Sequence, residues 1–142
     1  MSTENHYPSK EFEIISSLEE ICGPVNSSRY SLGIGDDCAI AHPSAQHQLT
    51  SADTAVENVH FSLEYMTLEQ IGYRAMVSNI SDIAAMGGEP YSVVLQIVFP
   101  KDRAGKSELE QLYKGIASAT NKWHIDVVGG DLDLWPIFRP KP

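Results

Sequence analysis

The strongest strand signal of the chain stands between two helix signals, and this order limits the possible folds more than any other feature. Residues 91–99 are rich in Val, Ile and aromatic side chains, which favour extended structure. Residues 67–70 form a capping-box pattern that opens a helix before this strand, and residues 107–110 form a second capping box after it. The order predicts helices packed against a sheet.

The remaining segments complete a pattern of alternating helices and strands. Apolar residues with a helical period predict a helix from Ser9 to Cys22, and two short strands are expected at 38–41 and 48–52. A last strand is expected at 125–128, and the prolines of residues 132–142 are expected to prevent regular pairing there. The resulting order, α-β-β-α-β-α-β, predicts an α+β fold with helices on a mixed β-sheet.

Length and charge restrict the class of function. A chain of 142 residues with 42% hydrophobic and 20% charged residues is expected to form one domain with a hydrophobic core. The formal net charge of −9 argues against a nucleic-acid binder, because phosphate backbones require a basic surface. It does not exclude nucleotides, because metal ions can supply the positive charge.

Cysteine usage and hydropathy indicate a cytoplasmic protein. Cys22 and Cys38 are the two cysteines and form no CxxC motif, so neither a disulfide framework nor a zinc site is expected. The first six residues are polar and lack the pattern of a signal peptide. The longest apolar run, at 93–100, is too short to span a bilayer, so no membrane association is expected.

Several aspartates stand beside glycines or short hydroxyl residues, which is typical of sites for hard cations. Magnesium prefers a few carboxylate oxygens and completes its octahedron with water and phosphate. Each motif also has a structural interpretation, as a turn or a cap. In the Gly-Ile-Gly-Asp-Asp segment the two aspartates would point to opposite faces of a strand, and we favour Asp37 as the ligand. The other candidate motifs are Ser51-Ala52-Asp53-Thr54, Asn79-Ile80-Ser81-Asp82 and Gly129-Gly130-Asp131.

The helix predicted after residue 67 has an unusual second face. One broad arc is apolar, whereas the other carries short side chains instead of the Lys and Glu residues of a solvent face. Asn79 and Asp82 are neighbours on this arc, and Arg74 is its one long side chain. The arc predicts a face against which another segment packs closely. A contact with a second helix is the alternative.

Known catalytic motifs narrow the chemistry further. The chain contains no P-loop, no protein-kinase motif set and no nucleophile elbow, and no nucleophile with a His base is visible. His60 is more often a structural residue in such a setting, although it could contact a phosphate without acting as a base. Magnesium-dependent phosphoryl transfer is the chemistry that the motifs leave open.

In this order, five segments resemble the thiamine-monophosphate kinases, a family of the aminoimidazole-ribonucleotide-synthetase superfamily. The Asn-x-Ser-Asp-x-x-x-Met-Gly helix is shared across that superfamily. The combination of Gly-Ile-Gly-Asp-Asp with the later Asp-Thr and His-Phe pairs is more specific to the kinases. The matching segments are 11–15, 33–39, 51–61, 79–87 and 128–131.

The resemblance implies ATP-dependent phosphorylation of thiamine monophosphate to thiamine diphosphate, with Mg²⁺ as cofactor and a homodimer as the working form. His60 would contact thiamine monophosphate, and no side chain is assigned a catalytic role. Gly130, Asp131 and Tyr113 would lie near ATP. The implied metal ligands are Asp37, Ser51, Asp53, Asp82 and Asp131.

The sequence departs from the family pattern at two positions. Ala52 and Leu132 stand where the family usually has Thr. Residues 1–131 are therefore expected to form the N-terminal ATP/Mg-binding and dimerisation domain, followed by a non-family tail at 132–142, with the C-terminal domain absent. For such a truncated kinase, the alternative is an inactive dimerisation or nucleotide-binding module. Another ATP-dependent synthetase of the superfamily is disfavoured by the Asp-Thr and His-Phe pairs.

Overall fold

The computed structural model describes residues 7–34, 39–42, 48–101, 103 and 105–135. The α+β class is confirmed, and so is the order of helices and strands. No described helix is long and apolar enough to cross a membrane. The elements are α1 (Tyr7–Cys22), β1 (Tyr30–Leu32), β2 (Ile40–Ala41), α2 (Leu68–Ala85), β3 (Ser92–Pro100), α3 (Lys106–Trp123) and β4 (Asp126–Trp135).

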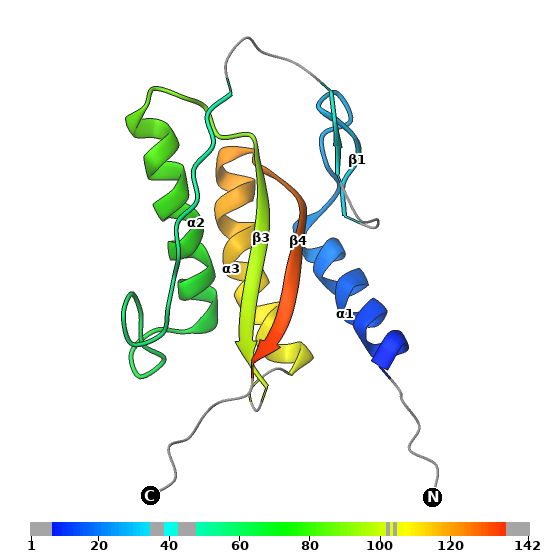
Figure 1. Cartoon of the computed structure of the whole chain (residues 1–142), viewed down its shortest axis with the longest axis vertical. Coiled ribbons are helices and arrows are strands. Elements are labelled where there is room, and N and C mark those ends of the chain that lie inside the picture. The colour runs from blue at the N-terminus through cyan, green and yellow to red at the C-terminus, as the bar shows by residue number, and fades with distance from the viewer. Residues whose placement is uncertain (1–6, 35–38, 43–47, 102, 104, 136–142) are drawn as a thin grey trace, which may run out of the picture.

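The centre of the fold is a β-α-β unit. Strands β3 and β4 pair in parallel, and α3 connects them. Parallel strands need such a crossover because the end of the first strand and the start of the second lie at opposite ends of the sheet. Figure 1 shows the strand pair lying across α3, with α2 on one side and α1 on the other. Both outer helices pack against α3.

The sheet is divided, unlike the single mixed sheet that the sequence predicts. Within the described residues, β1 and β2 form an antiparallel pair, and β3 and β4 form a separate parallel pair. The predicted strand at 48–52 is absent, and this segment instead runs beside α2, where the Ser51 hydroxyl contacts Asp82. The three-residue strand β1 is too short to give a sequence pattern. The predicted order of elements therefore matches the observed one, although one of the two strands before α2, β1, was not predicted.

The core lies between the helices and the inner face of the strand pair. On α3, Leu109, Leu112 and Ile116 are buried, and Trp123 on the same side is partly buried. The helices α2 and α3 approach closely at two glycines. A Cβ atom on Gly72 would overlap the Leu112 carbonyl oxygen, and one on Gly115 would overlap the Glu69 carbonyl. Other core members are Leu18, Ile71, Met76, Ile80, Phe99, Ala119, Ile125 and Val127.

One predicted capping box is confirmed and the other is wrong. Thr67 caps α2: its side chain accepts from the Gln70 amide at 3.2 Å, and the Gln70 side chain accepts from the Thr67 amide at 2.9 Å. Helix α3 begins earlier than the second box requires. Gly105 is its N-cap residue, without a side-chain hydrogen bond, and Ser107 already lies inside the first turn.

Replacing Thr67 with alanine should lower the free energy of unfolding by about 1 kcal/mol, because one amide of the first turn loses its acceptor. Urea titration followed by circular dichroism measures this change. The matched control is Ser107→Ala, which removes a hydroxyl that does not cap a helix. An equal loss of stability in both variants would contradict this assignment of the two caps.

Two predicted boundaries are also wrong. Helix α1 already includes Tyr7, two residues before the expected cap at Ser9. Strand β4 continues through residues 132–135, where Leu132 pairs with Ile97 and Leu134 pairs with Phe99. The prolines that argue against pairing begin at residue 136, after the strand. They limit the length of β4 without excluding its second half.

Candidate functional site

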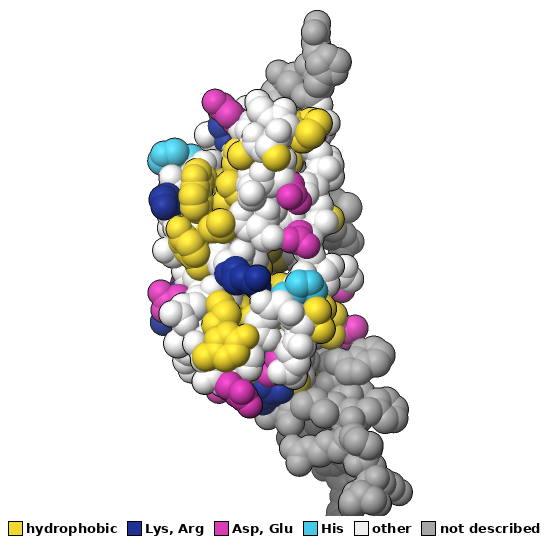
Figure 2. All heavy atoms as spheres, turned by 90° about the vertical axis from the view of Figure 1, so that its left-hand side faces the viewer, with side chains coloured by type: hydrophobic (Ala, Val, Ile, Leu, Met, Phe, Trp, Pro, Cys, Tyr) yellow, Lys and Arg dark blue, Asp and Glu magenta, His cyan; other side chains and the backbone are white. Residues whose placement is uncertain are grey.

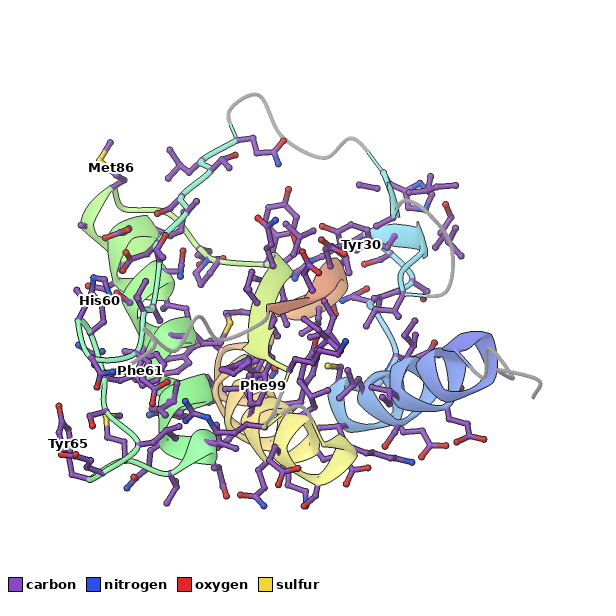
Figure 3. The ribbon with its side chains drawn as sticks, turned by 60° about the horizontal axis from the view of Figure 1, so that its bottom comes forward. Tyr30, His60, Phe61, Tyr65, Met86 and Phe99 are labelled. Carbon is purple, nitrogen blue, oxygen red and sulfur yellow. The ribbon has the colours of Figure 1, made fainter. Side chains whose placement is uncertain are left out.

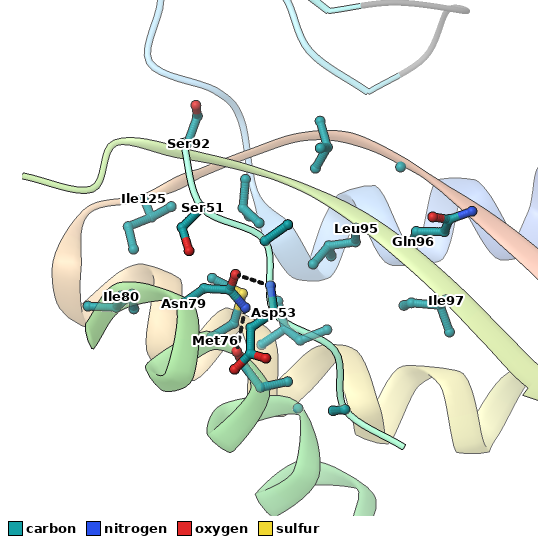
Figure 4. A pocket seen from close by; sticks show the side chains of 18 of the residues that line it. Ser51, Asp53, Met76, Asn79, Ile80, Ser92, Leu95, Gln96, Ile97 and Ile125 are labelled. Carbon is teal, nitrogen blue, oxygen red and sulfur yellow. Dashed lines mark hydrogen bonds between the residues drawn. The ribbon is translucent and has the colours of Figure 1, made fainter. Parts of the chain in front are cut away.

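A groove of about 2560 Å³ lies between the 48–57 segment, α2 and β3. Figure 4 shows Ser51, Asp53 and Asn79 on one wall, with Leu95 and Ile97 of β3 facing them. The groove exceeds the ~300–1,000 Å³ typical of a small-molecule pocket, so it has room for more than one ligand or for a polypeptide segment. Gly130 and Asp131 also line it.

The 51–54 segment packs against the face of α2 that carries short side chains. The Ser51 hydroxyl donates to Asp82 Oδ2 at 2.8 Å, and the Asp53 amide donates to Asn79 Oδ1 at 2.9 Å. The predicted close packing on this face is therefore confirmed. The alternative, a second helix packed on this face, is wrong, because α3 contacts α2 on the Gly72-containing side.

Asp53 has two hydrogen-bonded carboxylate oxygens. The Ser78 hydroxyl donates to Oδ2, and the Thr54 amide donates to Oδ1 at 2.8 Å. These bonds lower the pKa of Asp53 below its ordinary value, and the bond from Ser78 has the larger effect. The carboxylate is exposed and ionised at neutral pH, and each oxygen keeps a lone pair for a further ligand.

His60 projects from a turn beside α2. Its imidazole is exposed and its Nδ1 atom accepts a hydrogen bond from the Val56 amide at 3.1 Å. The next residue, Phe61, packs against the hydrophobic core. Figure 3 shows both residues beside α2, on the side of the molecule away from α1. The partly buried Phe61 thus anchors the turn that presents His60.

Gly130 and Asp131 lie in the middle of β4 instead of closing the strand as the sequence predicts. They pair with Leu95 and Gln96 of β3. A Cβ atom on Gly130 would overlap the Leu95 carbonyl, so the pairing itself requires glycine here. Asp131 is exposed along the groove. Because Asp131 pairs with Gln96, it lies on the outward face of the strand pair, with Val94 and Val98.

Tyr113 does not join this group. It is buried on α3, in the core that α1 covers, and it is not among the residues that line the groove. Burial raises the pKa of Tyr113 to about 12. Asp37 lies outside the described residues, so its place relative to the groove stays a prediction.

The buried phenol of Tyr113 gives a pH prediction. Its folded pKa, about 12, exceeds the ordinary value of 10.0, so the neutral phenol contributes stability below pH 10 that is lost as the pH rises towards 12. In Tyr113→Phe this part of the alkaline loss should disappear, as measured by urea titrations across this range. Tyr65→Phe is the matched control at an exposed tyrosine. An unchanged alkaline profile in Tyr113→Phe would contradict the prediction.

The donor set suits Mg²⁺ better than a softer metal. Asp53, Asp82 and Ser51 offer oxygen ligands on one face, and Mg²⁺ is commonly held by one or two carboxylates together with water and phosphate. Within the ranges that the structure describes, no three His, Cys, Asp or Glu side chains form a metal-binding group. A fully protein-built cage is therefore not present in those ranges, whereas the open octahedron of Mg²⁺ fits.

Three residues that organise this face were given no role in the sequence analysis. Asn79 and Ser78 hold Asp53, and Arg74 donates to the backbone carbonyl of His60. A signal was present for each of them. Asn79 lies three residues before Asp82, Ser78 lies on the same arc, and Arg74 is the one long side chain among short ones.

Comparison with known proteins identifies the family of the chain. Residues 35–141 match the family described as "AIR synthase related protein, N-terminal domain". The chain belongs to this family. The match extends into residues 132–141, the segment that the sequence analysis set apart as a tail.

The related proteins are thiamine-monophosphate kinases, as the sequence motifs suggested. The chain is 39% identical over 124 residues to that of Bacillus subtilis and 41% identical over 103 residues to that of Synechococcus elongatus. These matches cover 85% and 72% of this chain but 37% and 31% of the relatives. The chain thus spans about a third of their length.

A solved structure supports the same relationship. The crystal structure of thiamine-monophosphate kinase from Stenotrophomonas maltophilia aligns with a TM-score of 0.69 and 30% sequence identity. The alignment covers 92% of this chain and 39% of that one. The α+β fold of this chain is therefore also found in part of a solved thiamine-monophosphate kinase structure.

Proposed function

We propose that this chain takes part in the ATP-dependent phosphorylation of thiamine monophosphate to thiamine diphosphate in the cytoplasm. The observation that carries the proposal is the contact between the Ser51–Asp53 motif and the Asn79–Asp82 motif across one face of α2. Two separate acidic motifs that resemble those of the kinases thus meet beside the groove. The similarity to thiamine-monophosphate kinases supports this substrate.

Each residue would bind or orient a reactant. Asp53, Asp82 and Ser51 would hold Mg²⁺ at the face of α2, and Asp131 would supply a ligand from β4. Bound Mg²⁺ would neutralise the charge of the polyphosphate. Gly130 and Asp131 would lie beside the ATP phosphates, and His60 would contact the acceptor. Tyr113 is left out of this set because its side chain is buried in the core.

Isothermal titration calorimetry of the chain with a non-hydrolysable ATP analogue tests the proposal. Binding is expected in the presence of Mg²⁺ and not with EDTA, because carboxylates cannot attract a polyphosphate without a cation. Thiamine monophosphate should then bind to the nucleotide complex. A folded chain that binds neither ligand would refute the proposal. Binding of the nucleotide without thiamine monophosphate would favour another synthetase of the superfamily or a simple nucleotide-binding module.

We also propose that the working form is a homodimer. The outward face of the β3–β4 pair carries two exposed valines: Val94 is 70% exposed and Val98 is 56% exposed. A second copy that packed on this face would remove both valines from water. Sedimentation velocity over a range of concentrations should detect association, and Val94→Lys should weaken it. A monomer at every concentration would contradict the dimer.

A further inference from the structure

The turn that presents His60 is fixed from two sides by arginines of different elements. Arg74 of α2 donates through Nη1 to the backbone carbonyl oxygen of His60. Arg103, between β3 and α3, binds both carboxylate oxygens of Glu57, at 3.1 and 3.2 Å. A guanidinium is suited to such roles because its donors lie in a rigid plane. These two arginine contacts hold the backbone of the turn at His60 and the side chain of Glu57 in fixed positions.

Hydrogen bonds within the turn orient the backbone in the same way. The His60 amide donates to the Val56 carbonyl at 2.9 Å, and the Asn58 amide donates to the Phe61 carbonyl at 2.7 Å. Asn58 adopts φ 64°, a left-handed conformation that Asn tolerates better than most residues. The turn is thus closed without help from a ligand.

The imidazole is held by the same turn. The Val56 amide donates to Nδ1 of His60 at 3.1 Å, so Nδ1 must carry a lone pair. The proton of the neutral ring therefore resides on Nε2. Because the side chain is exposed, Nε2–H is available to a ligand as a hydrogen-bond donor.

Arg74 lies between this turn and the acidic group. Figure 2 shows this face of the molecule, where a basic side chain adjoins a histidine below two acidic side chains. A ligand that reaches both parts of this face would carry an anionic group towards Nε2–H.

We propose that Arg74 is a positioning residue, which holds the 56–61 turn so that His60 presents Nε2–H to the phosphorylated acceptor. This inference rests on the proposed function, since it assigns a donor role to the acceptor contact. His60 then orients the acceptor and does not remove a proton from it. The Arg74 contact and the Val56 contact act on the same residue, one on its backbone and the other on its ring.

Nitrogen-15 NMR of the ligand-free chain tests the geometry directly. At a pH that keeps imidazole neutral, His60 should show a protonated Nε2 and an unprotonated Nδ1. Arg74→Ala should shift the ring towards a mixture of tautomers, and Arg74→Lys should recover part of the wild-type signal because an ammonium can still donate. Lys114→Ala, at an exposed position on α3, should leave the ring unchanged.

The wild-type spectrum alone can overturn the inference. A proton on Nδ1 of His60 in the wild type would exclude the proposed donor. An unchanged tautomer in Arg74→Ala, with its fold intact by circular dichroism, would exclude the positioning role of Arg74. If Arg74→Ala does not fold, Arg74→Met decides, because it keeps the length of the side chain but cannot donate: an unchanged ring signal would then contradict the positioning role.

Ligand binding separates this inference from the proposed function. Arg74→Ala should bind thiamine monophosphate about tenfold more weakly, which corresponds to the loss of one hydrogen bond to a charged group. Its affinity for the Mg²⁺ complex of the ATP analogue should stay within about twofold of wild type, because the clamp acts on the acceptor side. If the wild type binds no ligand, the proposed function is refuted. The nitrogen-15 signals of the His60 ring still test whether Arg74 positions that ring. An equal loss for both ligands would contradict a specific role on the acceptor side.

Discussion

Asp82→Ala should weaken Mg²⁺-dependent binding of the ATP analogue by about 100-fold, or roughly 3 kcal/mol. The substitution removes a carboxylate from the face of α2 and leaves the Ser51 hydroxyl without the acceptor that now lies 2.8 Å away. Both effects act on the same ligand set. Calorimetric titration at fixed Mg²⁺ measures the change.

Two comparisons isolate the cause of this loss. Ser51→Ala removes the hydroxyl but keeps the carboxylate, so a smaller loss of about tenfold is expected. Glu64→Ala removes an exposed negative charge outside the groove and should leave the affinity unchanged. If Asp82→Ala bound the analogue as tightly as Glu64→Ala, Asp82 would have no place in the metal site.

Gly115→Ala should lower the free energy of unfolding by about 2–3 kcal/mol, because the added methyl group has no room between α2 and α3. Its Cβ atom would overlap the backbone carbonyl of Glu69, and a backbone group cannot turn aside as a flexible side chain can. The loss should exceed the gain in helix propensity of about 1 kcal/mol that alanine brings at an ordinary helical position. Urea unfolding gives the difference.

Gly129→Ala is the matched control for this substitution. A Cβ atom on Gly129 would meet no atom within 4 Å, so the same chemical change should not destabilise the chain. Gly72→Ala provides a second test at the same helix pair, since its Cβ atom would overlap the Leu112 carbonyl. Equal stability of Gly115→Ala and Gly129→Ala would mean that the two helices can separate without cost.

Local signals in the sequence predicted the helices well and the short strands poorly. The α2 cap was predictable because Thr67 and Gln70 satisfy each other within one turn. The 48–52 segment has the composition of a strand, but it lies against α2, where the Ser51 hydroxyl donates to Asp82, and it pairs with no described strand. Such a choice depends on a helix distant in sequence, which no local pattern contains.

The candidate site shows the same division. The meeting of Ser51 and Asp82 was predictable as close packing on the short-residue face of α2, although the partner segment was not. The burial of Tyr113 could have been predicted, because it follows Leu109 by four residues and therefore shares its side of α3. Gly130 shows the limit of motif reasoning, since a glycine expected at a phosphate also has a role in strand pairing.

The crossover through α3 also determines when the sheet can form during synthesis. Strand β3 must wait until α3 and then β4 have left the ribosome, because β4 is its one partner among the described strands. Contacts between distant segments form slowly, since the intervening chain must first be ordered. Until then the valines of β3 are accessible to chaperones or to other nascent chains.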